Sequence, residues 1–156
     1  MKRILVGVDG SPRAEGVLSV AIAIGRAQGA KMTLLRSVGL PPDVPQDFWK
    51  TTEEPLLAVL KRHAQEYLDA EAKKVPADLL DGTDLVVGVP WQAICGSAEE
   101  RKADLVVIGS HGYSGFDRLL GTTAAKVVNH APCSVLVVRE PRAEAGRWAE
   151  ETSVAT

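Results

Sequence analysis

The 156-residue sequence predicts a single α/β domain in which an open, five-stranded parallel sheet carries helices on both faces. Short runs rich in β-branched residues alternate along the chain with longer runs whose apolar residues recur at helical spacing. The short runs are almost continuously apolar, which is typical of strands covered on both faces. Strands that are joined through helices need crossover connections, and these connections produce a parallel sheet.

The expected strands and helices follow one another in regular order. A first helix should begin with Ser11 as its N-cap and Pro12 in its first position, and Gly29 should end it. Strands are expected over Arg3–Val8, Lys31–Val38, Leu85–Val89, Asp104–Gly109 and Ser134–Arg139. Further helices are expected over about Glu53–Lys74, over Trp91–Lys102 with an interruption at Gly96 and Ser97, and over Thr122–His130. The proline-containing segment 39–50 is expected to be a loop.

Composition narrows the classes of function. The formal net charge of −2 gives no electrostatic reason to expect a nucleic acid or an anionic membrane as a partner. No apolar run is long enough to cross a bilayer, so no membrane insertion is expected. The two cysteines, Cys95 and Cys133, are too few for a disulfide scaffold or a cysteine zinc site. Both are expected to be buried and to behave as small apolar residues. Such low cysteine content fits a cytoplasmic location. Residues 1–140 are expected to form the domain and residues 141–156 a C-terminal tail.

Two strand ends carry residues suited to holding a ligand. Asp9 follows the first strand, and a glycine-rich stretch from Gly109 to Thr123 follows the fourth strand and leads directly into a helix. In open parallel sheets, ligands bind beyond the carboxyl ends of strands where the strand order reverses. Thr122 and Thr123 open that helix, whose first N–H groups have no intrahelical partner and attract a phosphate.

Each of these features also has a purely structural interpretation. The glycines can simply form turns and helix caps. Asp9 can accept hydrogen bonds from the N–H groups that follow it, as an Asx-turn does, and this role is compatible with contact to a ligand. His111 in the glycine loop can face solvent, although it could also touch a phosphate. No nucleophile, base and orienting partner can be assembled from the spacing, so no catalytic residue and no metal ligand is predicted.

Two segments resemble the universal stress protein family. These are KRILVGVDGSPR, from Lys2 to Arg13, and ADLVVIGSHGYSGFDRLLGTTAAKVVNHAPCSVLVV, from Ala103 to Val138. The resemblance spans residues 2 to 139 and is weakest in the middle. It implies a Rossmann-like fold of the adenine nucleotide alpha hydrolase-like type, with strand order 3-2-1-4-5, so that the order reverses between the first and fourth strands.

The resemblance also implies a ligand and its contacts. In the ATP-binding branch of the family a motif of Gly, two residues, Gly, nine residues, Gly and Ser or Thr holds the nucleotide. The matching positions here are Gly109, Gly112, Gly121 and Thr122, with Thr123 beside them, and the phosphates would be bridged by Mg²⁺ or Mn²⁺. Asp9 and the backbone near Val38, together with Gly7 and Val8, would hold the adenine and ribose.

One departure from the motif keeps other functions open. Only eight residues, Tyr113 to Leu120, separate Gly112 from Gly121, so the loop before the phosphate position is one residue short. The branch of the family that does not bind ATP usually lacks the motif glycines, and this chain keeps them, so the resemblance still implies ATP as the ligand, with AMP or ADP as possibilities. A nucleotide-free module that docks on a protein client, and a slow ATPase or autokinase, are the alternatives. The apolar edge strand Ser134 to Val138 favours pairing with a second copy, and the family commonly forms homodimers through this strand.

Overall fold

The computed structural model of the chain describes residues 1–39, 46–110 and 120–139, with the backbone alone for 46–56. The described residues form one sheet of parallel strands in the order β3-β2-β1-β4-β5. The strands are β1 Arg3–Gly7, β2 Lys31–Val38, β3 Leu80–Val87, β4 Leu105–Gly109 and β5 Ser134–Val138. The helices are α1 Ala14–Gln28, α2 Gln46–Ala72, α3 Pro90–Glu100 and α4 Thr122–His130. The predicted fold class and strand order are confirmed.

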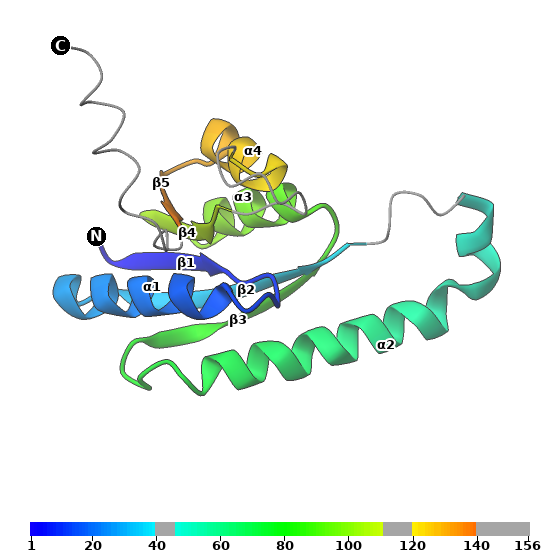
Figure 1. Ribbon diagram of the computed structural model, residues 1–156, viewed down its shortest axis with the longest axis horizontal. Helices are drawn as coiled ribbons and strands as arrows, with labels where there is room; N and C mark the ends of the chain where they lie inside the picture. The colour runs from blue at the N-terminus through cyan, green and yellow to red at the C-terminus, as the bar shows by residue number, and fades with distance from the viewer. Residues whose placement is uncertain (40–45, 111–119, 140–156) are drawn as a thin grey trace, which may run out of the picture.

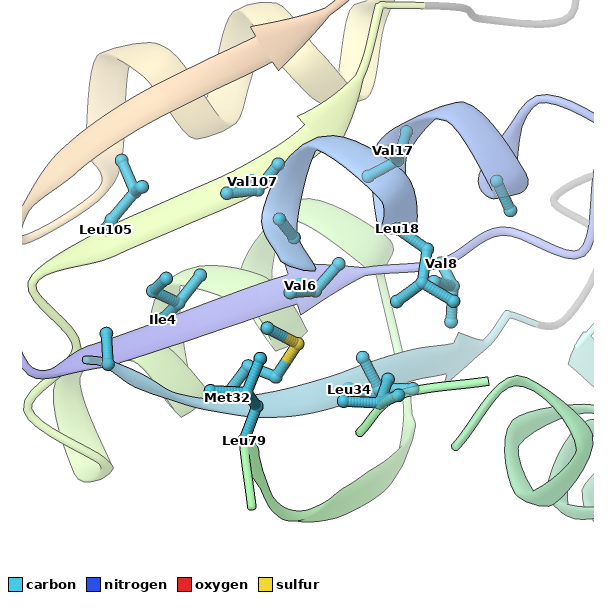
Figure 2. Close-up of a cluster of buried hydrophobic side chains, with 14 of the residues drawn as sticks. Ile4, Val6, Val8, Val17, Leu18, Met32, Leu34, Leu79, Leu105 and Val107 are labelled. Carbon is cyan, nitrogen blue, oxygen red and sulfur yellow. The ribbon is translucent and has the colours of Figure 1, made fainter. Parts of the chain in front are cut away.

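The helices cover both faces of the sheet, α1 and α2 on one side and α3 and α4 on the other (Figure 1). The central strand β1 shows why helices are needed on both faces. Ile4 and Val6 belong to the apolar cluster under α1 and α2, which Figure 2 shows, whereas Leu5 between them belongs to the cluster under α3 and α4. None of the three exposes more than 2% of its surface. A strand of this composition is stable only when both of its faces are covered.

Several local predictions are confirmed. Strand β2 and helix α4 have the predicted bounds. Gly29 ends α1 in the left-handed conformation, with φ of 61°. One prediction is wrong: helix α3 runs through Gly96 and Ser97 without the expected interruption. Ser97 is buried there, and a side chain at Gly96 would meet open space.

The start of α1 differs from the prediction. The helix begins at Ala14 with Arg13 as N-cap, so Ser11 and Pro12 lie before it. The reason is a turn that precedes the helix: the Ala14 N–H donates to the Ser11 carbonyl at 3.1 Å. The Ser11 N–H itself donates to Asp9 Oδ1 at 2.9 Å, so the hydrogen bonds of this segment close a tight turn instead of a cap.

Strand β3 begins five residues earlier than predicted and ends at Val87. Its first half is polar and hides the strand pattern, because β3 lies at an edge of the sheet. Arg101 binds Asp84 through two hydrogen bonds of 2.5 Å, and its guanidinium also lies 3.9 Å from Asp81. The strand stops where Gly88 adopts φ of 150°.

Two further expectations need correction. Helix α2 begins at Gln46, inside the segment predicted to be a loop, because the three prolines that suggested the loop all precede residue 46. Cys95 and Cys133 are free and half-buried, not fully buried. Burial raises the pKa of both thiols. The tail 141–156 lies outside the described residues.

Helix α2 carries polar side chains on the face that packs against the sheet. Glu71 is 5% exposed, and its Oε1 accepts a hydrogen bond from Lys74 Nζ at 2.7 Å. One turn earlier, the Tyr67 ring lies beneath the guanidinium of Arg36, with 4.6 Å from Cζ to the ring centroid. The Tyr67 hydroxyl and Glu71 Oε2 are buried and have no hydrogen-bond partner among the described residues. This polar contact between α2 and β2 is unusual in an otherwise apolar layer.

Gly96 inside α3 and Gly29 at the C-cap of α1 provide a matched test of backbone strain. Gly96→Ala should raise the free energy of unfolding by about 0.5–1 kcal/mol, because alanine loses less entropy in a helix and finds open space there. Gly29→Ala also meets open space, but the left-handed backbone should make it destabilising by about 1–2 kcal/mol. Urea unfolding of both variants measures the difference, and equal effects would contradict the assignment of Gly29 as a strained cap.

Tyr67 gives a test by titration. Burial is the main cause that raises the pKa of its hydroxyl from 10.0 to about 12, followed by the Glu71 and Asp9 carboxylates. Because the neutral form is favoured in the folded state, the stability this contributes is present below pH 10 and is lost as the pH rises through about 12. Near-ultraviolet absorbance of tyrosinate should therefore show one late step, which Tyr67→Phe removes. A late step that persists in the variant would assign it to the only other tyrosine, Tyr113.

Candidate functional site

The candidate site lies where the strand order reverses, at the carboxyl ends of β1 and β4. The chain leaves β1 toward β2 and leaves β4 toward β5, in opposite directions along the sheet. The register pairs Val6 with Val107, so the segments that follow the two strands emerge next to each other. The connections on either side of such a reversal leave a crevice in which parallel α/β proteins bind ligands.

A tight turn after β1 holds the carboxylate of Asp9 at this edge. Asp9 is exposed, and its Oδ1 accepts the Ser11 N–H at 2.9 Å. Gly10 in the centre of the turn has φ of 78°, a conformation that favours glycine. The Ser11 hydroxyl is buried without a hydrogen-bond partner among the described residues. The Asx-turn interpretation of Asp9 is confirmed, and the second carboxylate oxygen has no hydrogen-bond partner within the described ranges.

The start of α4 is fixed to the end of β4. The Gly121 N–H donates to the Ser110 carbonyl at 2.9 Å, and Gly121 is the N-cap of the helix. The Gly121 carbonyl in turn accepts the Ala125 N–H at 2.9 Å, which is the first N–H with a helical partner. The N–H groups of Thr122 and Thr123 therefore have no intrahelical acceptor, and no side chain caps them. The helix dipole adds partial positive charge at the same point.

The other predicted contacts on β1 and β2 can reach a ligand only through their backbones. Val8 and Val38 are 4% and 6% exposed, so their side chains belong to the core. Gly7 has a packing role, because a Cβ there would lie 3.0 Å from Ile108 Cγ2 and 3.5 Å from Ile94 Cδ1. Its absence of a side chain lets α3 approach the sheet closely.

The predicted residues on the glycine-rich stretch are only partly described. Gly109 ends β4, and a Cβ there would lie 3.4 Å from Val17 Cγ2, so it adjoins α1. Gly112, His111 and most of the loop Tyr113 to Leu120 lie outside the described residues. Of the predicted site, the structure thus brings together the Asp9 turn, Gly109 and the start of α4.

The remaining histidines do not add to the site. His63 is exposed on α2, and His130 is at the far end of α4, where its Nδ1 lies 2.8 Å from the Lys126 carbonyl. Trp91 packs beside His130 with 4.9 Å between ring centroids. Within the described ranges, no three His, Cys, Asp or Glu side chains cluster as they would around a metal ion.

Sequence reasoning missed one residue near the site, Arg36. Its guanidinium packs against the backbone of Gly10, since a Cβ built on that glycine would lie 3.0 Å from both Cζ and Nη2. The opposite contact of the guanidinium is the Tyr67 ring. The sequence did contain two signals for this contact: a charged residue within an apolar strand, and Glu71 on the apolar face of a helix. They could be interpreted only once it was known which elements pack together.

A hollow of about 790 Å³ lies at the amino ends of the strands, away from the candidate site at their carboxyl ends. It is lined by residues at the amino ends of β1 and β2, including Arg3 and Lys31, and by Arg101 after α3. These three cations already have partners: Lys31 Nζ donates to the Asp78 carbonyl at 2.5 Å, Arg3 Nη1 donates to the Arg101 carbonyl at 3.1 Å, and Arg101 binds Asp84.

No helix in the described part of the chain has the length and apolar character needed to cross a membrane.

Comparisons with known proteins agree with this architecture. The model of the universal stress protein family matches residues 1–139. A universal stress protein of Methanocaldococcus jannaschii is 34% identical over 149 residues, covering 92% of this chain and 85% of the relative. A solved universal stress protein from Lactobacillus plantarum superposes with a TM-score of 0.75 at 28% identity, covering 88% of this chain and 97% of the other. A universal stress protein solved in complex with cAMP has a TM-score of 0.60 at 27% identity, with coverages of 88% and 96%. With a family match over nearly the whole chain and the expected strand order, this chain belongs to the universal stress protein family.

Proposed function

We propose that this chain binds an adenine nucleotide, ATP in the first place, at the strand reversal and acts as a regulatory nucleotide-binding module in stress response. One observation carries the proposal. The bond from the Gly121 N–H to the Ser110 carbonyl holds the unpaired amides of α4 at the same sheet edge as the Asp9 carboxylate. Amides suit phosphate oxygens, and a carboxylate suits ribose hydroxyls or an adenine amine.

The related structure in complex with cAMP supports the ligand class. On this proposal Asp9 and the backbones of Gly7, Val8 and Val38 hold the adenine and ribose. Gly109 lies against the ribose. Gly112, Gly121, Thr122 and Thr123 hold the phosphates, with Mg²⁺ or Mn²⁺ bridging phosphate oxygens. AMP and ADP would use the same adenine and ribose contacts with fewer phosphate contacts.

Binding, and not rapid turnover, is the proposed mode of action. A bound nucleotide would change the surface that the carboxyl edge of the sheet presents to a protein client. The half-buried, unpaired thiols of Cys95 and Cys133 fit a reducing cytoplasm. A nucleotide-free docking module and a slow ATPase or autokinase are the competing functions that the binding experiment separates.

Calorimetric titration with ATP and Mg²⁺ tests the proposal. The wild type should release or absorb heat on binding, and Asp9→Ala should weaken binding by about tenfold to a hundredfold, since it removes a charged hydrogen-bonding group. Gly121→Val should abolish binding because its side chain would project at the start of α4. Asp78→Ala, which removes an exposed carboxylate at the other edge of the sheet, serves as the control and should bind as the wild type does.

Asp9→Asn separates the two roles of this side chain. The asparagine oxygen can still accept the Ser11 N–H and keep the turn, but it lacks the charge. Weaker binding by Asp9→Asn would assign the carboxylate to the ligand, whereas wild-type binding would restrict Asp9 to the turn. Absence of heat in the wild type would reject nucleotide binding, and ADP formed over time would favour the ATPase.

We also propose that two copies of the chain pair through β5. Among the described residues, β5 is hydrogen-bonded to β4 alone, and residues 135–138 are half-buried. An apolar edge strand of this kind is a template for a second strand, and a two-fold axis closes the assembly.

Val137→Lys tests this pairing. Val137 is partly buried against the apolar cluster under α3 and α4, and lysine there puts a charge at the proposed interface. Sedimentation should show loss of the dimer, and circular dichroism checks that the fold is retained. Val87→Lys places the same charge on the opposite edge strand, where the wild-type side chain is 42% exposed, and should leave the dimer intact. A wild-type chain that sediments as a monomer would exclude the pairing.

A further inference from the structure

We propose that Arg36 and Tyr67 are positioning residues for the nucleotide site: their stack holds the Asp9–Ser11 turn and couples it to helix α2. The inference rests on the proposed function, because it assigns residues that set the affinity of the same site. Neither residue belongs to the glycine motif or to the strand ends that form the site.

The Arg36 guanidinium contacts two separate elements. Its Cζ lies 4.6 Å from the centroid of the Tyr67 ring. It also packs against Gly10, where a methyl group would clash with Nη1. Within the described ranges, the guanidinium has no hydrogen bond or ion pair. Its contacts are therefore a ring and a turn, and they join two separate elements of the fold.

The turn that Arg36 contacts has a special backbone conformation. Gly10 has φ of 78°, and a hydrogen bond from the Ser11 N–H to the exposed Asp9 carboxylate closes the turn. Glycine adopts positive and negative φ about equally readily, so the packing of Arg36 adds to this one bond in holding the conformation. The guanidinium of Arg36 occupies the space in which Gly10 would otherwise move.

Tyr67 connects this contact to helix α2. This helix packs on β2 and β3, whereas the Asp9 turn follows β1. Arg36 comes from β2, and continuing the register that pairs Gly7 with Leu35 places it beside the end of β1. The Gly10 N–H is near enough to the Tyr67 hydroxyl to lower its pKa slightly, although the two do not meet hydrogen-bond geometry. The stack thus reaches from α2 across β2 to the turn.

A coupling of this kind is reciprocal. If docking of α2 stabilises the turn that receives the nucleotide, then bound nucleotide must stabilise docking of α2 by the same free energy. Amide hydrogen exchange reports both effects, since it measures local opening at the Ser11 amide and at the amides of α2 around Tyr67.

The experiment compares Arg36→Leu with Tyr67→Phe, both as full-length protein. Arg36→Leu removes the cation and keeps an apolar side chain, and it should weaken ATP binding about fivefold to tenfold, the range of a partly buried cation–π contact. Tyr67→Phe keeps the ring and should stay within about twofold of the wild type. ATP should slow exchange of the Ser11 amide and of the α2 amides in the wild type but slow only the Ser11 amide, and less strongly, in Arg36→Leu. Tyr67→Leu removes the ring instead of the cation and gives the same test if Arg36→Leu does not fold.

The outcomes distinguish this inference from the proposed function. If the wild type binds ATP and Arg36→Leu binds equally well with the same slowing of α2 exchange, the positioning role is wrong and the nucleotide site stands. If binding weakens only in proportion to a general loss of protection over the whole domain, the role of Arg36 is structural and the inference is again wrong. If the wild type binds no ATP, the proposed function fails and the inference falls with it.

Discussion

Strand β1 has to be covered on both faces and bonded along both edges, because Ile4, Leu5 and Val6 are nearly inaccessible to water. It pairs with β2 on one side and β4 on the other. Crossovers between parallel strands have one hand, so moving from β1 toward β3 puts α1 and α2 on one face. Moving from β4 toward β5 puts α4, together with α3, on the other face. The helices on both faces of the sheet and the reversal of strand order therefore both follow from the burial of β1.

The chemistry of the candidate site follows from this reversal. Two chain segments that are a hundred residues apart emerge side by side, one with a carboxylate and one leading to the start of a helix. The bond from the Gly121 N–H to the Ser110 carbonyl ties the start of α4 to the carboxyl end of β4, next to the end of β1 that Asp9 follows. Opposite partial charges at neighbouring strand ends suit a ligand that has both donors and phosphates. At the amino ends of the strands, by contrast, Arg101 and Lys31 are already bonded to Asp84 and to the Asp78 carbonyl.

Sequence patterns predicted best the elements that carry strong local signals. Strand β2 and helix α4 were correct to the residue, because apolar runs and helix breakers are strong local signals. The polar first half of β3 escaped detection, since an edge strand with Asp81 and Asp84 does not look apolar. The cap at Ser11 was wrong because Asp9, two residues earlier, binds its N–H. Local signals failed where a neighbour outside the pattern supplied a competing hydrogen bond.

By itself the sequence determined the fold class, and it predicted the two strand ends of the candidate site with Asp9, Gly109, Gly121, Thr122 and Thr123 as its residues. These predictions needed only the residue pattern of a single strand or helix and the glycine and threonine residues at its ends. Only the tertiary structure decided that Arg36 lies between Gly10 and Tyr67, and that Gly7 is required by the approach of Ile108. Such contacts join β1, β2 and α2 or β1 and β4, and no local periodicity encodes them. They exist because the sheet brings distant segments within van der Waals distance.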